Sequence, residues 1–140
     1  SVTRTQLRKS GISVKCRLDS QLPSVGCSGR FLYQVVLNLV LNAMAAMPSG
    51  GPLSVRTGVR GGGTEVVLEV RDGGRGVSED VMPQLFEPFL SKGERRGTGL
   101  GLFVTHGLVR ECGGQIQVDS ISGRGTTFRV LLPTRAENVA

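Results

Sequence analysis

The sequence predicts an α/β fold, a two-layer α/β sandwich, from two patterns. Five segments alternate between apolar and polar residues, which is the pattern of strands that bury one face only. Three further segments repeat apolar residues at helical spacing. A doubly wound parallel sheet needs strands that are apolar on both faces, so the alternation argues against that fold. Helices packed on the apolar face of such a sheet would form the second layer.

The alternation defines the strands. In residues 12–18 every second residue is apolar, and four later segments show the same period. Between the second and third strands, residues 60–63 are expected to form a glycine-rich hairpin turn. The five predicted strands are 12–18, 53–59, 64–71, 115–120 and 126–132.

The predicted helices are bounded by recognisable start and stop signals. The first covers 28–47, where Ser28 can cap it and a Pro-Ser-Gly-Gly run ends it. The second runs from Ser78 to about Phe86, and two acidic residues follow its start, where a helix favours negative charge. The third runs from about 99 to 112 and ends at a Gly-Gly pair.

The chain of 140 residues is long enough for a single domain, which we expect to cover residues 1–140. Its 39% hydrophobic and 20% charged residues are ordinary for a globular protein. No apolar run approaches the roughly 20 residues that span a bilayer, and the polar, basic start does not form a signal peptide. Any membrane anchor of a parent protein is therefore expected outside this chain.

The three cysteines are expected to be unpaired. Their odd number and their spacing match neither a zinc site nor a disulfide framework. Cys16 and Cys112 lie in apolar patterns that suit small, reduced core residues, while Cys27 has no such context. Reduced thiols favour a cytoplasmic location.

The net charge of +6 raises the question of a nucleic-acid partner. The basic residues are scattered singly and aromatic residues make up only 4% of the chain, whereas a groove for nucleic acid clusters basic residues and interleaves aromatic ones. We therefore expect no nucleic-acid partner. The charge is better explained by attraction for anions in general, polyphosphates included.

The first predicted helix carries three amide side chains in an otherwise apolar sequence. Gln34, Asn38 and Asn42 recur every fourth residue, so they lie on one face of the helix. A buried amide without a partner costs about 1–3 kcal/mol, so the three need partners. They could form a hydrogen-bonded stripe against the sheet, or their oxygens could coordinate a hard cation such as Mg²⁺.

Two glycine-rich stretches are further candidates for a site. Residues 72–76 (Asp-Gly-Gly-Arg-Gly) follow a strand, and are either a turn or a place where the backbone closely approaches a ligand beside Asp72. Residues 97–102 (Gly-Thr-Gly-Leu-Gly-Leu) open the third helix and form either its cap or an anion site. The charged loop 88–98 before them contains basic residues that either face solvent or pair with phosphates.

Taken together and in this order, these segments resemble the catalytic, ATP-binding domain of sensor histidine kinases, and among them the nitrogen-regulation-type two-component kinases. That domain belongs to an ATPase superfamily shared with gyrase, heat-shock chaperones and mismatch-repair proteins. The resemblance covers roughly the whole chain, and five motifs in the correct order are rarely a coincidence. The matching stretches are the N box at 38–43, the Asp-x-Gly-x-Gly box at 72–76, the phenylalanine box at 86–89, the Gly-x-Gly-Leu-Gly box at 97–102 and the closing Gly-x-Gly-Thr-x-Phe element at 123–128.

The resemblance implies a Bergerat fold, in which a mixed sheet carries three helices on one face. It also implies that Asp72 accepts a hydrogen bond from the adenine amino group and that Thr126 lies beneath the base. Gly74 and Gly76 would let the base and ribose lie close to the backbone. Guanine has an acceptor where adenine has a donor, so Asp72 predicts a preference for ATP over GTP.

At the phosphate end, the resemblance implies that Asn42 holds Mg²⁺ on the triphosphate with support from Asn38. The residues from 86 to 98 would form a mobile lid over the nucleotide. The full set of implied ATP-binding residues is Asn38, Asn42, Asp72, Gly74, Gly76, Phe89, Lys92, Arg95, Arg96, Gly97, Thr98, Gly99, Leu100, Gly101, Leu102 and Thr126.

The chain departs from the family pattern in two ways. Many relatives have a Lys shortly after the second Asn, where this chain has two alanines, so a phosphate contact would come from Lys92, Arg95 or Arg96. The phospho-acceptor helices are also missing from the sequence. Its one histidine, His106, is followed by Gly-Leu-Val rather than by the acceptor pattern, so we expect a packing or surface residue.

The resemblance implies that the parent protein transfers the γ-phosphoryl group of ATP to a histidine outside this chain. The acceptor and the general base would both lie there, so no catalytic residue is expected here. The implied cofactors are ATP and Mg²⁺. The implied partners are the parent's own dimerisation helices, in a homodimer, and a response regulator.

Other functions remain open. A different ATPase of the superfamily would need a catalytic Glu in the first helix, and no acidic residue occurs between Phe31 and Met47. A serine-protein kinase of the anti-sigma-factor type has a similar domain, but the phenylalanine box and the 97–102 run favour the histidine kinase. An interaction module without nucleotide binding would not need the intact Asn42, Asp72 and glycine motifs.

Overall fold

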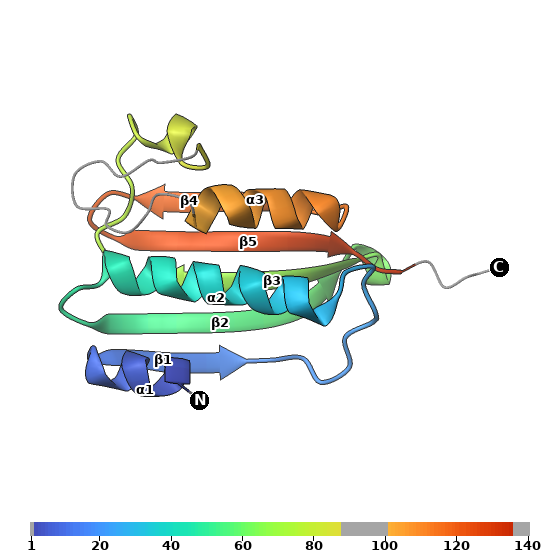
Figure 1. The fold of residues 1–140 in the computed structure, drawn as a ribbon, viewed down its shortest axis with the longest axis horizontal. Helices are drawn as coiled ribbons and strands as arrows, with labels where there is room; N and C mark the ends of the chain where they lie inside the picture. The colour runs from blue at the N-terminus through green and yellow to red at the C-terminus, as the bar shows by residue number, and fades with distance from the viewer. Residues whose placement is uncertain (1, 88–100, 136–140) are drawn as a thin grey trace.

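The computed structural model describes residues 2–87 and 101–135 of the chain. Figure 1 shows the order of the helices and strands within these residues. The α-helices are α1 (Val2–Lys9), α2 (Gly29–Ala46) and α3 (Gly101–Glu111), and two 3₁₀ helices cover Gly61–Gly63 and Met82–Gln84. The strands are β1 (Ile12–Arg17), β2 (Gly51–Arg60), β3 (Glu65–Asp72), β4 (Gln115–Ile121) and β5 (Gly125–Pro133).

The five strands form one mixed sheet in the order β1-β2-β3-β5-β4. β1 runs parallel to β2, and every other neighbouring pair is antiparallel. The three α-helices all lie on one face of this sheet (Figure 1). The predicted two-layer α/β sandwich is therefore confirmed, together with the five strands and the turn at residues 60–63.

Helix α2 is the central element of the helical layer. Its N-cap is Ser28, as predicted, whose Oγ accepts a hydrogen bond from the Phe31 N–H at 3.2 Å. Its buried side chains, Val35, Leu39 and Ala43 among them, recur every four residues and face the sheet. The apolar residues of α2 are not all in the core, since Tyr33 and Leu41 are 65% and 45% exposed.

The core lies between the helices and the sheet. Leu39 of α2, Val70 of β3 and Phe128 and Val130 of β5 are at most 1% exposed. Burial of an apolar side chain of this size contributes about 1.5–3 kcal/mol. The core therefore fixes α2 over β3 and β5, the strands whose ends carry the candidate site.

Two helices differ from the prediction. Residues 78–86 contain only the short 3₁₀ helix Met82–Gln84, because Pro83 has no N–H to donate within an α-helix and its ring crowds the preceding turn. Helix α1 was not predicted, and its Leu7 is 7% exposed and belongs to the core. The sheet thus carries three α-helices as expected, but one of them comes from the start of the chain.

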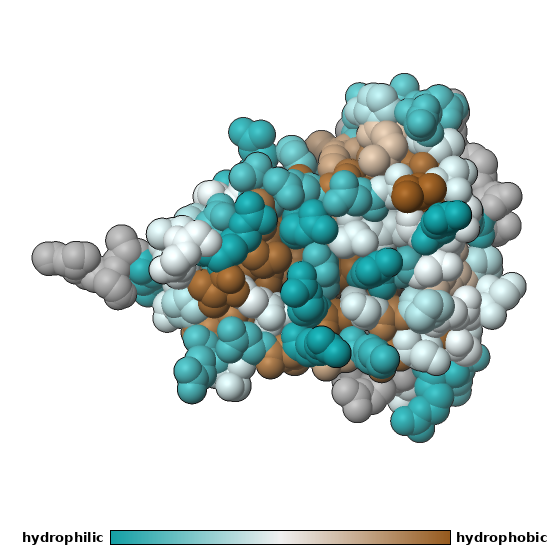
Figure 2. Space-filling model, turned by 180° about the vertical axis from the view of Figure 1, so that it is seen from behind, coloured by the Kyte–Doolittle hydropathy of each residue, from teal (hydrophilic) through white to brown (hydrophobic). Residues whose placement is uncertain are grey.

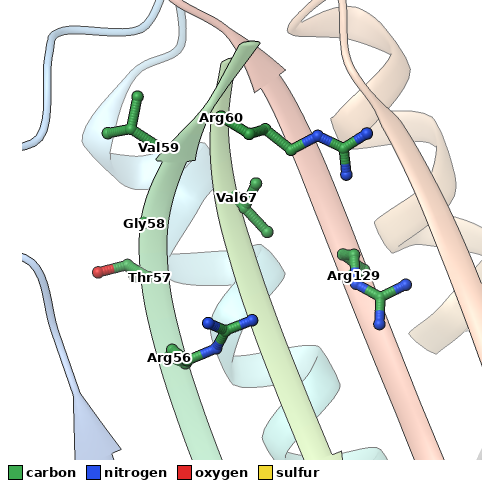
Figure 3. Close-up of a pocket in the computed structure, with 7 residues that line it drawn as sticks. All are labelled: Arg56, Thr57, Gly58, Val59, Arg60, Val67 and Arg129. Atoms are coloured by element: carbon green, nitrogen blue, oxygen red, sulfur yellow. The ribbon is translucent and has the colours of Figure 1, made fainter. Parts of the chain in front are cut away.

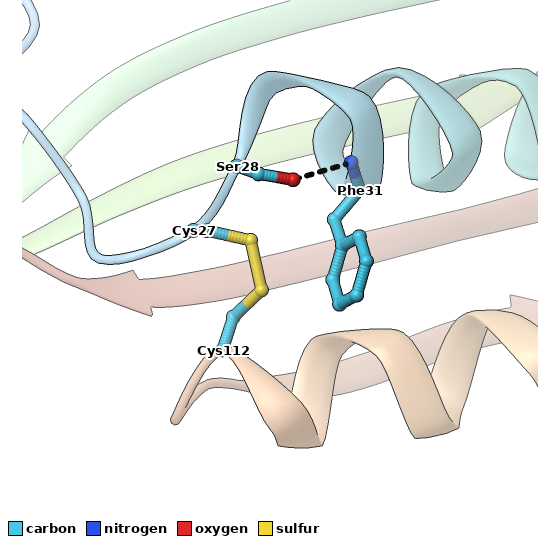
Figure 4. The surroundings of a disulfide bond; sticks show 4 residues. All are labelled: Cys27, Ser28, Phe31 and Cys112. Carbon is cyan, nitrogen blue, oxygen red and sulfur yellow. Dashed lines mark hydrogen bonds between the residues drawn. A yellow bond between two sulfur atoms is a disulfide. The ribbon is translucent and has the colours of Figure 1, made fainter.

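The cysteine prediction was wrong. Cys27 and Cys112 form a disulfide, with their Cα atoms 5.2 Å apart (Figure 4). Cys27 directly precedes the cap of α2 and Cys112 directly follows α3, so the packing of these helices brings together two residues 85 positions apart. Cys16 is free but exposed on β1 rather than buried. A cytoplasmic location therefore cannot be argued from reduced thiols.

In the part of the chain that the structure describes, no helix combines the length and the apolar character that a membrane span requires.

Candidate functional site

Asp72 is the charged residue at the centre of the candidate site. It ends β3 and pairs across the sheet with Thr126, and the two residues are 4% and 5% exposed. Its Oδ1 accepts a hydrogen bond from the Gly74 N–H at 2.8 Å. This short contact fixes the carboxylate at the start of the 72–77 loop, which follows the strand.

Ser120 joins this loop to the edge of the sheet. Its Oγ accepts a hydrogen bond from the Val77 N–H at 2.7 Å and lies 2.9 Å from Thr126 Oγ1. The Ser120 hydroxyl is also 3.1 Å from the Gly125 carbonyl oxygen. The sequence reasoning missed Ser120, although its place in the alternation of β4, in phase with Val118, marks it as an inward polar residue.

The glycines of the loop allow close packing within the protein itself. A side chain at Gly74 would collide with the Ala46 carbonyl oxygen at the end of α2. Gly76 has a φ of +76°, and a side chain there would collide with the Ile121 carbonyl oxygen of β4. These contacts explain the glycines without a ligand, and room for a base and ribose stays a prediction.

The amides of α2 link it to the start of α3. Gln34 Nε2 donates to Asn38 Oδ1 at 2.8 Å, and Asn38 Nδ2 lies 3.5 Å from the Gly101 carbonyl oxygen. Thr105, which is fully buried, donates its hydroxyl proton to the same carbonyl at 2.7 Å. Gln34 and Asn38 are therefore hydrogen-bonded as predicted, but to each other and toward α3 rather than against the sheet, and Gln34 is exposed. Asn42 lies one turn further along α2 and is half-buried.

The phenylalanine box begins in the core. The Phe86 ring lies 5.1 Å from the His106 ring, measured between centroids, and makes an edge contact with Phe128 at 6.3 Å. His106 is half-buried on α3 by this contact, which agrees with its predicted role in packing. Leu102, in the first turn of α3, is 6% exposed and belongs to the core, while Gly101 is exposed.

Half of the predicted ATP-binding set lies outside the described residues. The structure brings the other half together at the ends of β3 and β5 and beside α2 and the start of α3. The predicted residues outside the described part are Phe89, Lys92, Arg95, Arg96, Gly97, Thr98, Gly99 and Leu100.

Comparison with known proteins gives consistent matches. The family model described as histidine kinase-, DNA gyrase B- and HSP90-like ATPase matches residues 27–136. Sporulation kinase E of Bacillus subtilis (strain 168) is 36% identical over 130 residues, which make up 93% of this chain and 17% of that protein. Sensor histidine kinase ZraS of Escherichia coli (strain K12) is 40% identical over 122 residues, 87% of this chain and 26% of that protein.

A solved structure has a similar fold. The full-length structure of ShkA in complex with AMPPNP is 27% identical and superposes with a TM-score of 0.82 over 96% of this chain and 28% of that one. The chain spans 17% and 26% of the two curated relatives, so it corresponds to one part of much longer proteins.

Proposed function

The chain belongs to the family of histidine kinase-, DNA gyrase B- and HSP90-like ATPases, and from this premise we propose that it binds Mg·ATP as the catalytic domain of a sensor histidine kinase. The observation that carries the proposal is the buried carboxylate of Asp72, held by the Gly74 N–H and placed opposite Thr126. A buried carboxylate at the end of a strand needs hydrogen-bond donors, and an amine on a bound base would be one more of them.

The adenine end of the nucleotide would be read by Asp72. Its carboxylate can only accept hydrogen bonds, and adenine offers an exocyclic amine as donor. Thr126, linked to Ser120, can orient a hydroxyl toward the same base. Guanine would set its carbonyl acceptor against the carboxylate, and for this reason ATP is preferred over GTP.

The phosphate end would lie along α2 and the start of α3. Asn42 presents a half-buried amide whose oxygen suits Mg²⁺, a cation that takes few protein ligands and keeps waters and phosphate oxygens. Bound Mg²⁺ supplies positive charge against the phosphates. Asn38 supports this position from the next turn, and Lys92, Arg95, Arg96 and the 97–101 glycines supply further phosphate contacts.

The parent protein would use the bound nucleotide to phosphorylate a histidine on its own dimerisation helices, as a homodimer, and pass the phosphoryl group to a response regulator. The contribution of this chain is to position the triphosphate and stabilise its charge, which is the main work in phosphoryl transfer. Support comes from the similarity to sensor kinases at 36% and 40% identity. A cytoplasmic location belongs to the same proposal.

The test is calorimetric titration with AMPPNP, a non-hydrolysable ATP analogue, with and without Mg²⁺. We expect micromolar binding that Asn42→Ala and Asp72→Asn each weaken by about tenfold or more, equivalent to ~1.4 kcal/mol. Gln117→Ala, on the exposed outer side of β4, is the matched control and should bind like the wild type. A folded wild-type chain that does not bind AMPPNP would overturn the proposal in favour of an interaction module.

A further inference from the structure

The face of the sheet that carries no helix has a row of polar side chains across three strands. Lys15 of β1 is the register partner of Ser54 of β2, and Ser54 is the partner of Arg71 of β3. These positions alternate with Leu53 and Val70, which are 1% exposed and face the core. Figure 2 looks onto this face, where hydrophilic residues lie among hydrophobic ones.

A cavity of about 590 Å³ opens over this row. Lys15 and Arg71 line it together with Ser13, Ser54 and Arg124, which comes from the turn between β4 and β5. The volume falls in the range of small-molecule sites, about 300–1,000 Å³. The cavity is therefore large enough for a compact ligand.

The cations of this cavity have no carboxylate partner among the residues that the structure describes. Lys15, Arg71 and Arg124 are exposed and take part in none of the ion pairs within residues 2–87 and 101–135. The one acidic residue in the lining, Asp72, is 4% exposed and accepts a hydrogen bond from Gly74 on the loop. The positive charge of the cavity is therefore not neutralised from within.

Three other arginines on the same face are neutralised. Arg56 pairs with Glu69 at 3.2 Å and Arg60 with Glu65 at 3.4 Å. Arg129 contacts Glu69 at 3.0 Å and Asp119 at 3.1 Å.

The hydrogen bonds that Arg129 donates to Glu69, and then to Asp119, raise the pKa of Arg129 above its ordinary value, so its charge is held. A smaller hollow of about 190 Å³ lies among Arg56, Arg60 and Arg129 (Figure 3).

We propose that the larger cavity is a binding site for a small polyanion that carries at least two phosphate or carboxylate groups. Lys15 and Arg71 are two strands apart, roughly 10 Å, so they hold separate anionic groups of one ligand. Arg71 and Arg124 offer planar guanidinium groups that bind oxyanions with paired hydrogen bonds. Ser13 and Ser54 donate hydroxyl protons between them. The basic residues of this site lie on the side of the sheet away from the helices, and the cavity borders the candidate nucleotide site at Asp72.

The test is a nuclear magnetic resonance titration of the ¹⁵N-labelled chain with inorganic pyrophosphate, and in parallel with citrate, both without Mg²⁺. We expect saturable shifts at Ser13 and Ser54. Arg71→Gln and Arg124→Gln should each weaken binding by about fivefold to tenfold. Arg56→Gln removes the same charge from the same face outside the cavity and should change the affinity by less than about twofold. Tighter pyrophosphate binding assigns phosphate groups to the ligand, and tighter citrate binding assigns carboxylates.

Three outcomes would overturn the proposal. The first is the absence of saturable shifts with either anion. The second is an equal loss of affinity in Arg56→Gln, which would mean diffuse attraction by the net charge. The third is a set of shifts confined to Asn38, Asn42 and Gly101, which would place the anion in the helical layer instead.

Discussion

The Ser120 hydroxyl lies at the centre of the hydrogen bonds that join the 72–77 loop to β4 and β5. It accepts from the Val77 N–H and contacts both Thr126 Oγ1 and the Gly125 carbonyl oxygen. The loop therefore takes its position from a residue about 45 positions further along the chain, as well as from Asp72. In the proposed site, Ser120 would act through Thr126, whose hydroxyl it contacts.

Replacing Ser120 with Ala should lower the free energy of unfolding by about 1–3 kcal/mol, because the Val77 N–H and Thr126 hydroxyl lose their partner. Urea denaturation measures the change. Ser122→Ala is the control, since Ser122 is exposed in the following turn, and it should stay within about 0.5 kcal/mol of the wild type. Equal stability of the Ser120→Ala chain would show that these hydrogen bonds contribute nothing net.

A pair of glycines separates the effect of backbone conformation from the effect of packing. Gly76 and Gly123 have similar φ angles, +76° and +83°, but only at Gly76 would an added side chain meet a backbone atom, the Ile121 carbonyl oxygen. Alanine at either position should cost roughly 1–2 kcal/mol for the left-handed conformation. Gly76→Ala should cost more because of the collision. Thermal denaturation of both variants checks this, and equal losses would contradict the contact.

Helices α2 and α3 carry the amides and the opening glycine of the candidate site, and they are fastened together at both ends of their contact. Asn38 approaches the Gly101 carbonyl at one end, and the Cys27–Cys112 disulfide closes the other. The spacing of the two helices is thus set by side chains and by a covalent bond.

Removal of the disulfide by Cys27→Ser with Cys112→Ser should lower the free energy of unfolding by about 2–5 kcal/mol. The wild-type chain in dithiothreitol should show the same loss, and the double variant should be insensitive to the reductant. Cys16→Ser is the control, because Cys16 is free and exposed, and it should not change stability. A reductant effect that persists in the double variant would contradict the pairing.

Most elements could be predicted from sequence because their signals are local. Alternation identified the five strands, and Ser28 identified the start of α2. The cysteine pair could not be predicted, because it depends on how two helices far apart in sequence pack against each other. The segment before Phe86 does not form the predicted α-helix: the acidic residues at 79–80 suit a helix start, but Pro83 cannot take part in an α-helical interior.

For the candidate site, motif order predicted Asp72 and Thr126, and the cross-strand register pairs them. The positions of the glycines were also predicted, but not the reason for them: Gly74 and Gly76 lie against the protein's own backbone. Close approach between two segments leaves no trace in the spacing of residues along the chain. Ser120 was missed for a similar reason, since its partners come from two other segments, the 72–77 loop and β5.

At the scale of the whole molecule, the sheet separates two electrostatic environments. The helical side holds a buried carboxylate and amides, and the other side holds basic residues that are partly neutralised by carboxylates. The two sides should therefore respond differently to added ligands.

Nucleotide binding should stabilise the whole fold. AMPPNP at 100 times its Kd should add about 2.7 kcal/mol and raise Tm by roughly 8 °C in the presence of Mg²⁺. GMPPNP at the same concentration should raise Tm by much less. Its guanine base places a carbonyl oxygen, a hydrogen-bond acceptor, against the Asp72 carboxylate, which can only accept. Differential scanning fluorimetry measures the Tm with each nucleotide, and equal Tm shifts would contradict the role assigned to Asp72.

The disulfide also changes what a break in the backbone does to the molecule. Cys27 and Cys112 enclose the exposed glycine turn at 61–63, so a peptide bond cleaved there leaves both pieces in one covalent molecule. Such a nicked chain would migrate as a single species in gel electrophoresis until the disulfide is reduced. Because of the Cys27–Cys112 bond, the two parts of the domain stay covalently connected when any one peptide bond between β2 and β3 is broken.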